Sequence, residues 1–167
     1  QMSLHYTTFG KEAIDSTKLG LYFADEKPDY QYSTYSLSHG GTSIEIPPGV
    51  SDHEMRASHV FEDEVVLHGL RPHMHYRGKR MRFSVVYPDG TKDQIINVPD
   101  YNFAWQPTYR LSEPMLLPAG SRVMIEGAFD NSQYNLGNPD PAAAVTGGAQ
   151  SWDEMFIGYL SYNKTSQ

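Results

Sequence analysis

Short extended runs between turn residues, with no amphipathic helical repeat among them, limit the folds open to this chain more than any other feature. The 167 residues include 14 glycines and 11 prolines, the residue types that most often separate strands. The clearest turn is Pro88-Asp89-Gly90, where proline presets φ and glycine tolerates the positive φ of a tight hairpin. Pro118-Ala119-Gly120 and Pro47-Pro48-Gly49 punctuate the chain in the same way. We therefore expect a protein built from strands.

The runs between these turns predict an all-β fold, an antiparallel β-sandwich. Aromatic residues make up 13% of the chain and tyrosine alone contributes 12, which suits half-buried strands. We expect about eight or nine short strands, enough for two packed sheets. The runs with clear bounds are 18–24, 42–46, 64–68, 81–87, 91–98, 108–111, 121–128 and 156–162. Two stretches are predicted to be irregular, the opening through Asp15 and the segment 130–150.

Length, charge and composition restrict the organisation of the chain and its partners. A chain of 167 residues suits one domain with one substantial core, so residues 1–167 are expected to form a single domain. The formal net charge of −7 argues against nucleic-acid binding, which needs a concentrated positive surface. No apolar run approaches the roughly 20 residues that cross a bilayer. The chain has no cysteine, so it offers neither a disulfide nor a thiolate ligand.

His73 and His75 are the residues with the most evident chemistry. In an extended segment both imidazoles project from one face while Met74 points to the other, so they could share one metal ion. Alternating polar residues on a solvent-exposed strand would give the same pattern, and the pair alone leaves both interpretations open. Met155, which follows Asp153 and Glu154, is by itself better explained as a core methionine. Two neutral imidazoles and a thioether together would favour copper, especially Cu(I), over zinc, magnesium or calcium.

The residues around His73, His75 and Met155 resemble motifs of the copper type II, ascorbate-dependent monooxygenases, the family of peptidylglycine alpha-hydroxylating monooxygenase and dopamine beta-monooxygenase. The likeness is to the C-terminal domain, covers almost the whole chain and is closest to bacterial members. It implies a jelly-roll sandwich in which His73, His75 and Met155 bind the copper that binds oxygen. The motifs that carry it are Ile46-Pro47-Pro48-Gly49, Pro72-His73-Met74-His75-Tyr76-Arg77-Gly78 and Trp152-Asp153-Glu154-Met155.

Leu4-His5-Tyr6 resembles the strand that closes the preceding domain in two-domain members of this family. That strand supplies the last of three histidines to a second copper, and His5 matches this histidine. The other two would lie upstream of residue 1, so in this chain alone His5 is better explained as an exposed histidine near a terminus. Residues 1–15 are expected to be a remnant of that strand and its linker. Gln1 indicates a processed chain or one cut from a longer protein.

Arg71 and Tyr159 occupy the positions that grip the substrate's carboxylate in the peptide-hydroxylating relatives. A guanidinium offers two parallel donors that suit a carboxylate, although strands also use arginine and tyrosine for surface packing. The asparagine that assists these two residues in the relatives is replaced here by Ile157. The chain also lacks the cysteines that form disulfides in the animal relatives.

The activity that the resemblance implies is hydroxylation of a C–H bond with O2 and ascorbate or another electron donor. A second copper, in an N-terminal domain of the same parent protein, would supply the other electron. The leading hypothesis is therefore one copper domain of a longer monooxygenase that acts on a small molecule or peptide, with the isolated domain not competent for the full reaction. The alternatives are a copper-binding or electron-transfer module without oxygenase activity, and a purely structural sandwich. A periplasmic or extracellular location is expected.

A few further residues carry expectations that the structure can test. Trp105 is expected to fill the core. Glu154 either orients the histidines or lies in solvent. The loop 135–141 could be a calcium-like oxygen site, but a loop held by its own hydrogen bonds is favoured. His68 should lie on the face opposite His73 unless a bulge intervenes.

Overall fold

The computed structural model describes residues 4, 6, 9–28, 31–39 and 44–165, and within them it contains ten strands and no helix. The expected all-β fold is therefore confirmed, and none of the described residues forms a helix able to cross a membrane. The strands are β1 (Ser33–Ser38), β2 (Glu45–Ile46), β3 (His53–Val60), β4 (Val65–His73), β5 (Gly78–Val86), β6 (Lys92–Val98), β7 (Tyr109–Leu117), β8 (Arg122–Phe129), β9 (Val145–Thr146) and β10 (Ile157–Lys164).

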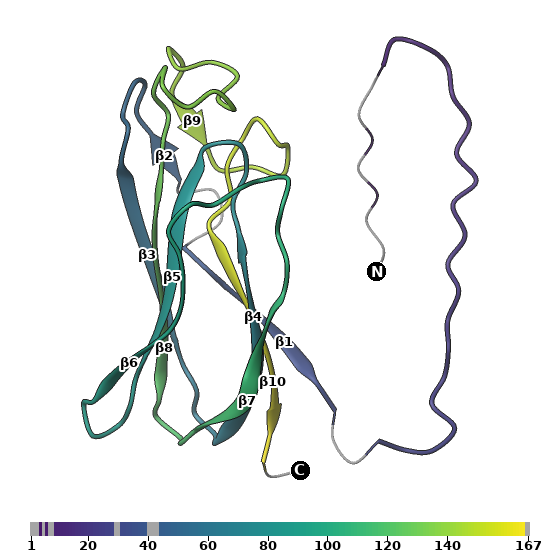
Figure 1. Ribbon diagram of the computed structural model, residues 1–167, viewed down its shortest axis with the longest axis vertical. Coiled ribbons are helices and arrows are strands. Elements are labelled where there is room, and N and C mark those ends of the chain that lie inside the picture. The colour runs from purple at the N-terminus through teal and green to yellow at the C-terminus, as the bar shows by residue number, and fades with distance from the viewer. Residues whose placement is uncertain (1–3, 5, 7–8, 29–30, 40–43, 166–167) are drawn as a thin grey trace.

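The strands form two four-stranded sheets packed face to face, as Figure 1 shows. One has the order β1-β10-β4-β7 and the other β3-β8-β5-β6, with every neighbouring pair antiparallel, and β2 and β9 form a small third sheet. The core between the sheets is drawn from both, for example from Leu70 and Leu160 on one side and Phe83 and Ile125 on the other, all fully buried. The antiparallel sandwich is thus confirmed, and the jelly-roll type stays a prediction.

The glycines of the three predicted turns adopt positive φ. Gly49, Gly90 and Gly120 have φ values of 71°, 86° and 88°, which residues with a side chain rarely adopt. The hairpin around Gly90 is closed by a bond from the Tyr87 amide to the Thr91 carbonyl of 2.8 Å. It joins β5 to β6, as the Pro88-Asp89-Gly90 motif predicted.

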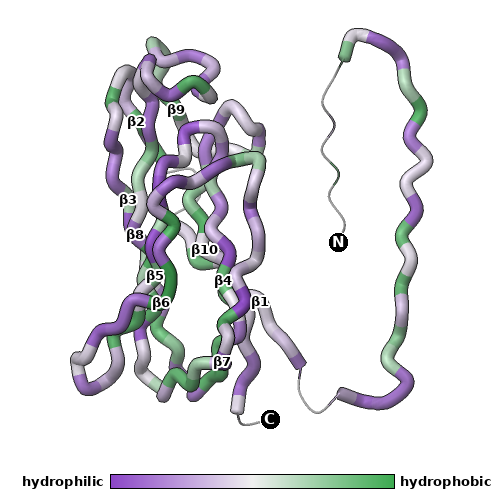
Figure 2. Tube along the Cα trace, viewed as in Figure 1, coloured by the Kyte–Doolittle hydropathy of each residue, from purple (hydrophilic) through white to green (hydrophobic). Residues whose placement is uncertain are grey.

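The expected strand at 18–24 is wrong, because residues 9–28 contain no strand and each of their side chains is exposed. Figures 1 and 2 show this stretch running apart from the sandwich, with apolar and polar residues alternating along it. A strand needs a hydrogen-bonded neighbour, and no described strand pairs with this segment. Trp105 was also expected in the core and is 71% exposed, since it lies in the loop between β6 and β7.

Three strands, β1, β3 and β9, were not predicted from the sequence. Along β3 the half-buried positions are His53, Met55, Ala57 and His59, a weakly apolar set that hides the alternation. The first strand, β1, and the short β9 carry equally little apolar signal, with one buried residue each. Of the expected run 42–46, residues 42 and 43 lie outside the described residues and β2 spans only Glu45 and Ile46.

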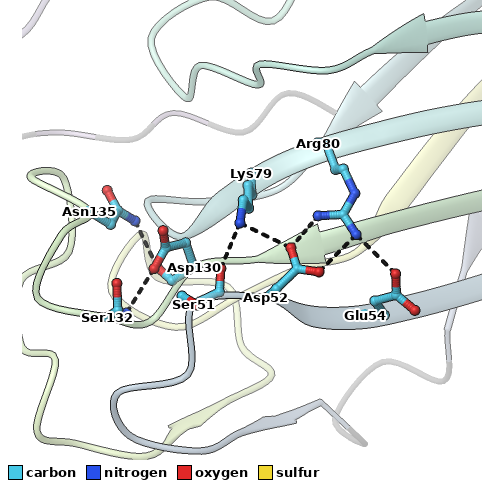
Figure 3. A network of polar contacts seen from close by, with 8 residues as sticks. All are labelled: Ser51, Asp52, Glu54, Lys79, Arg80, Asp130, Ser132 and Asn135. Carbon is cyan, nitrogen blue, oxygen red and sulfur yellow. Dashed lines mark hydrogen bonds and ion pairs between the residues drawn. The ribbon is translucent and has the colours of Figure 1, made fainter.

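A polar network ties β5 to the start of β3 across the middle strand β8 (Figure 3). Glu54 and Arg80 both pair with Ala128, and the small alanine lets the guanidinium reach Glu54 at 3.0 Å and contact Asp52 as well. Lys79 bonds the Ser51 carbonyl at 2.8 Å. These pairs are substantially exposed, so each stabilises the fold only slightly.

The packing between the sheets leads to a prediction at Gly158 of β10. A Cβ there would lie 2.6 Å from Phe83 Cε1 and 2.7 Å from Ile125 Cγ2, whereas a Cβ at Gly20 would meet nothing within 4 Å. Gly158→Ala should lower the free energy of unfolding by about 1–3 kcal/mol because two core side chains must move. Gly20→Ala should leave it unchanged. Urea unfolding followed by tryptophan fluorescence measures both, and equal stability of the two variants would contradict this packing.

Candidate metal centre

A β-bulge in β4 decides which of its side chains face outward. The register with both β10 and β7 skips His68, passing from Leu67 directly to Gly69. Leu67 and Leu70 are both fully buried, so the two residues between them share the outer face. Counting on from Leu70, Arg71 and His73 also face outward. The bulge that the sequence left open is present, and it places His68 on the same face as His73.

His73 and His75 project together from the end of β4. Met74 between them is fully buried in the core, and its carbonyl and amide both bond the Tyr101 hydroxyl, at 2.6 and 3.0 Å. The two imidazole rings contact each other edge to face, with centroids 5.2 Å apart. The extended geometry predicted from the His-Met-His spacing is therefore observed.

The ring of His73 is fixed in one tautomer by Gln106. The Gln106 side-chain amide donates through Nε2 to the Phe103 carbonyl at 2.8 Å, so its oxygen must face His73. His73 Nδ1 lies 2.7 Å from that oxygen and must carry the proton, which leaves Nε2 as the basic nitrogen. Burial lowers the pKa of His73, with a smaller opposing effect of Gln106, so the ring is neutral at pH 7 as a metal ligand must be.

The ring of His75 has the same tautomer for a different reason. Its Nδ1 lies 3.1 Å from the backbone carbonyl of Asp153. A carbonyl only accepts hydrogen bonds, so Nδ1 is again protonated and Nε2 again carries the lone pair. Metal-binding histidines commonly donate their second nitrogen to a carbonyl in this way. Both rings therefore meet the requirement for imidazole ligands to a metal.

Glu154 holds the downstream segment against the histidines. Its two carboxylate oxygens accept the amides of His75 and Arg77, each at 2.7 Å, and the side chain is fully buried. Burial raises the pKa of this carboxyl to about 7, against the lowering effect of the two amides and of the Arg77 guanidinium. Arg77 is 2% exposed and donates to Asn131 and to the Trp152 carbonyl. The orienting interpretation of Glu154 fits this arrangement, and the solvent-exposed one does not.

Met155 follows this clamp and leads into β10. Ile157 pairs with His73, and Met155 lies two residues before Ile157, outside β10. The side chain is half-buried and lines a cavity of about 240 Å³ together with Ile44, His39 and neighbouring residues, and neither His73 nor His75 lines this cavity. Within the described part of the chain, no three His, Cys, Asp or Glu side chains are grouped to hold a metal. His73, His75 and Met155 as a joint ligand set therefore stay a prediction.

Arg71 and Tyr159 form the next pair along the same face. They are direct partners across β4 and β10, and the guanidinium carbon lies 4.3 Å from the centre of the Tyr159 ring. The Tyr159 ring centroid is 6.1 Å from that of His73. Arg71 makes no ion pair with any described carboxylate. Ile157, in place of an amide side chain, lies beside His73.

The remaining expectations fall away from this centre. His5 lies outside the described residues. The loop 135–141 is held by its own side chains, with Asn135 accepting the Gly137 amide at 3.0 Å and Asp140 the Ala142 amide at 2.9 Å, as the hydrogen-bonded alternative predicted. Gln106 and the buried Asn131 were not predicted from the sequence. Asn131 joins Arg77 to the Pro47 and Ala143 carbonyls. Neither stands in a motif that marks its role.

The fold is thus an all-β sandwich in which two imidazoles, each in a fixed tautomer, lie side by side at the end of β4. Residues 35–167 match the family described as copper type II ascorbate-dependent monooxygenase, C-terminal domain, and the chain belongs to this family. It is therefore a copper monooxygenase C-terminal domain, and such a domain implies an N-terminal partner domain. No curated protein matches the chain.

The clamp at Glu154 gives a prediction about stability. Glu154→Ala leaves the buried amides of His75 and Arg77 without an acceptor, which should cost about 2–4 kcal/mol of unfolding free energy. Glu113→Ala is the control, because Glu113 is exposed and bonds no described residue. Guanidinium unfolding of both variants provides the comparison. A loss at Glu154 no larger than at Glu113 would show that the clamp contributes nothing.

Proposed function

We propose that His73 Nε2, His75 Nε2 and the Met155 thioether hold a single copper in this domain. The observation that carries the proposal is the pair of fixed tautomers, since two separate acceptors leave the same nitrogen basic in each ring. When bound, copper would supply the one-electron chemistry that uses O2 and a reductant such as ascorbate to hydroxylate a C–H bond. A soft thioether beside two imidazoles favours Cu(I), and three protein ligands would leave one coordination position open.

The protein's own contribution is orientation. Gln106 and the Asp153 carbonyl fix the rotation of the two rings, and the buried Met74 anchors the backbone between them. Glu154 binds the amide of His75 and immediately precedes Met155, so it holds the two ligand segments together. Rigid ligands of this kind need little rearrangement when the metal changes its oxidation state.

Substrate binding is assigned to Arg71 and Tyr159. One step along an antiparallel strand pair, about 7 Å, separates them from His73. The Arg71 guanidinium stacks on Tyr159 and has no carboxylate partner among the described residues, so it can receive the carboxylate of a small molecule or peptide.

The full reaction belongs to a longer protein. An N-terminal domain would bind a second copper, with His5 as one of its ligands, and supply the other electron, so the isolated domain should not complete the reaction. The periplasmic or extracellular location and the bacterial origin stay predictions. Ascorbate-dependent O2 consumption with a hydroxylated product would identify the enzyme. Copper uptake without it, in the full-length protein, would identify an electron-transfer or storage module instead.

The ligand set predicts how the methionines respond to replacement. Cu(I) titration of the chain should reach a stoichiometric end point, and X-ray absorption should show a sulfur scatterer beside two imidazoles. Met155→Leu should lose the sulfur signal and weaken binding by about 10-fold or more. Met74→Leu is the matched control, because Met74 is buried in the core on the opposite face, and it should keep both. A sulfur signal that survives Met155→Leu would refute the assignment.

The hydrogen bond to His73 makes a second prediction about metal affinity. Gln106→Leu removes the acceptor that fixes the ring, so Cu(I) affinity should fall about 10-fold, while Met155 still gives its sulfur signal. Gln94→Leu changes an exposed glutamine on the other sheet and should leave the affinity unaltered. Competition with a coloured Cu(I) chelator measures both variants. If they bind copper equally well, Gln106 does not orient the ligand.

A further inference from the structure

The outer face of the first sheet is organised as a ladder that leads away from the histidines. Ile157 and His73 form one rung, Tyr159 and Arg71 the next. The third rung crosses three strands, because Gly69 of β4 pairs with Ser161 of β10 and with Arg110 of β7. Successive rungs on one face are about 7 Å apart. The third rung therefore lies about 13 Å from His73, with Arg71 between them.

This third rung is hollow because its central strand has no side chain there. Gly69 faces outward as part of the bulge, and Ser161 beside it is small. A cavity of about 400 Å³ lies over them, with Tyr32, Leu111 and Pro114 among its lining residues. A Cβ at Gly69 would approach the Tyr109 carbonyl to 3.0 Å, so the close approach of β4 and β7 favours glycine at this position. The hollow is thus a product of the bulge and the residue it selects.

Arg110 brings a positive charge to this cavity. Arg110 lines it, is exposed, and makes no ion pair with a described carboxylate. Arg71, one rung away, is likewise without a carboxylate partner among these residues. Two such guanidinium groups on one face stand out in a chain whose formal net charge is −7. Most of the remaining lining is apolar, so the cavity suits an organic anion with an apolar body better than an inorganic ion.

We infer that the hollow over Gly69 is a binding subsite for the far end of an elongated organic dianion, whose second carboxylate bonds Arg110. Its first carboxylate lies at Arg71, which rests on the proposed function, and its carbon chain runs over Gly69 and Ser161. The two carboxylates of an extended hexanedioate are about as far apart as two successive rungs of the ladder, about 7 Å. The domain is thereby selective for substrates with acidic groups at both ends.

The test is calorimetric titration of the metal-free chain with hexanedioate and with hexanoate, which have the same length and differ in the second carboxylate. Hexanedioate should bind about fivefold more tightly, the scale of one exposed charge pair. Arg110→Gln should make the two acids bind equally. Arg122→Gln changes an exposed arginine on the other sheet that has no ion pair among the described residues, and it should preserve the preference. Ser161→Phe, which fills the hollow, should weaken both acids, with circular dichroism confirming that the variant is folded.

The outcomes separate this subsite from the role of Arg71. Equal binding of the two acids to the unaltered chain, a preference that survives Arg110→Gln, or no binding of either acid would overturn the subsite. If Arg71→Gln leaves hexanoate binding intact, the carboxylate role of Arg71 fails, while the preference governed by Arg110 still decides the subsite. If Arg71→Gln abolishes binding of both acids and Arg110→Gln removes only the preference, both assignments stand.

Discussion

One buried carboxylate holds the candidate centre together. Glu154 accepts the amides of His75 and Arg77 from a position with no solvent exposure. Burying a carboxylate costs several kcal/mol, and this cost is offset by two short charge-assisted hydrogen bonds and the nearby Arg77 guanidinium. In return, two segments almost eighty residues apart in the chain are fixed against each other. His75 and Met155 acquire a defined relation without any disulfide, in a chain that has no cysteine.

A second constraint is the regularity of the β4–β10 ladder. Antiparallel pairing puts partners on the same face, so the residues that surround the proposed copper follow from register. Ile157 falls opposite His73 and Tyr159 opposite Arg71. The bulge at His68 then turns Gly69 outward and opens the hollow beside Arg110. One strand pair thus sets His73, the proposed carboxylate-binding pair and the proposed far subsite along a single line.

Features that depend on residues close together in the sequence were predicted correctly. The His-Met-His alternation predicts two outward imidazoles and a buried methionine, and the Pro-Asp-Gly motif predicts a hairpin; both are observed. Features that depend on contacts between residues distant in the chain were not predicted from the sequence. Gln106 orients His73 from the loop before β7, and nothing in its local sequence marks it. The apolar alternation at 18–24 predicted a strand, but alternation cannot say whether a partner strand is present. The bulge at His68 required knowing two neighbouring strands at once.

The central claim is that two imidazole nitrogens and one thioether sulfur meet at a single ion. Crystals of the domain loaded with Cu(I), measured on either side of the copper absorption edge, test it most directly. One anomalous peak should lie within bonding distance of His73 Nε2, His75 Nε2 and the sulfur of Met155. A peak bonded to the histidines but remote from Met155, or one located elsewhere on the sandwich, would contradict it.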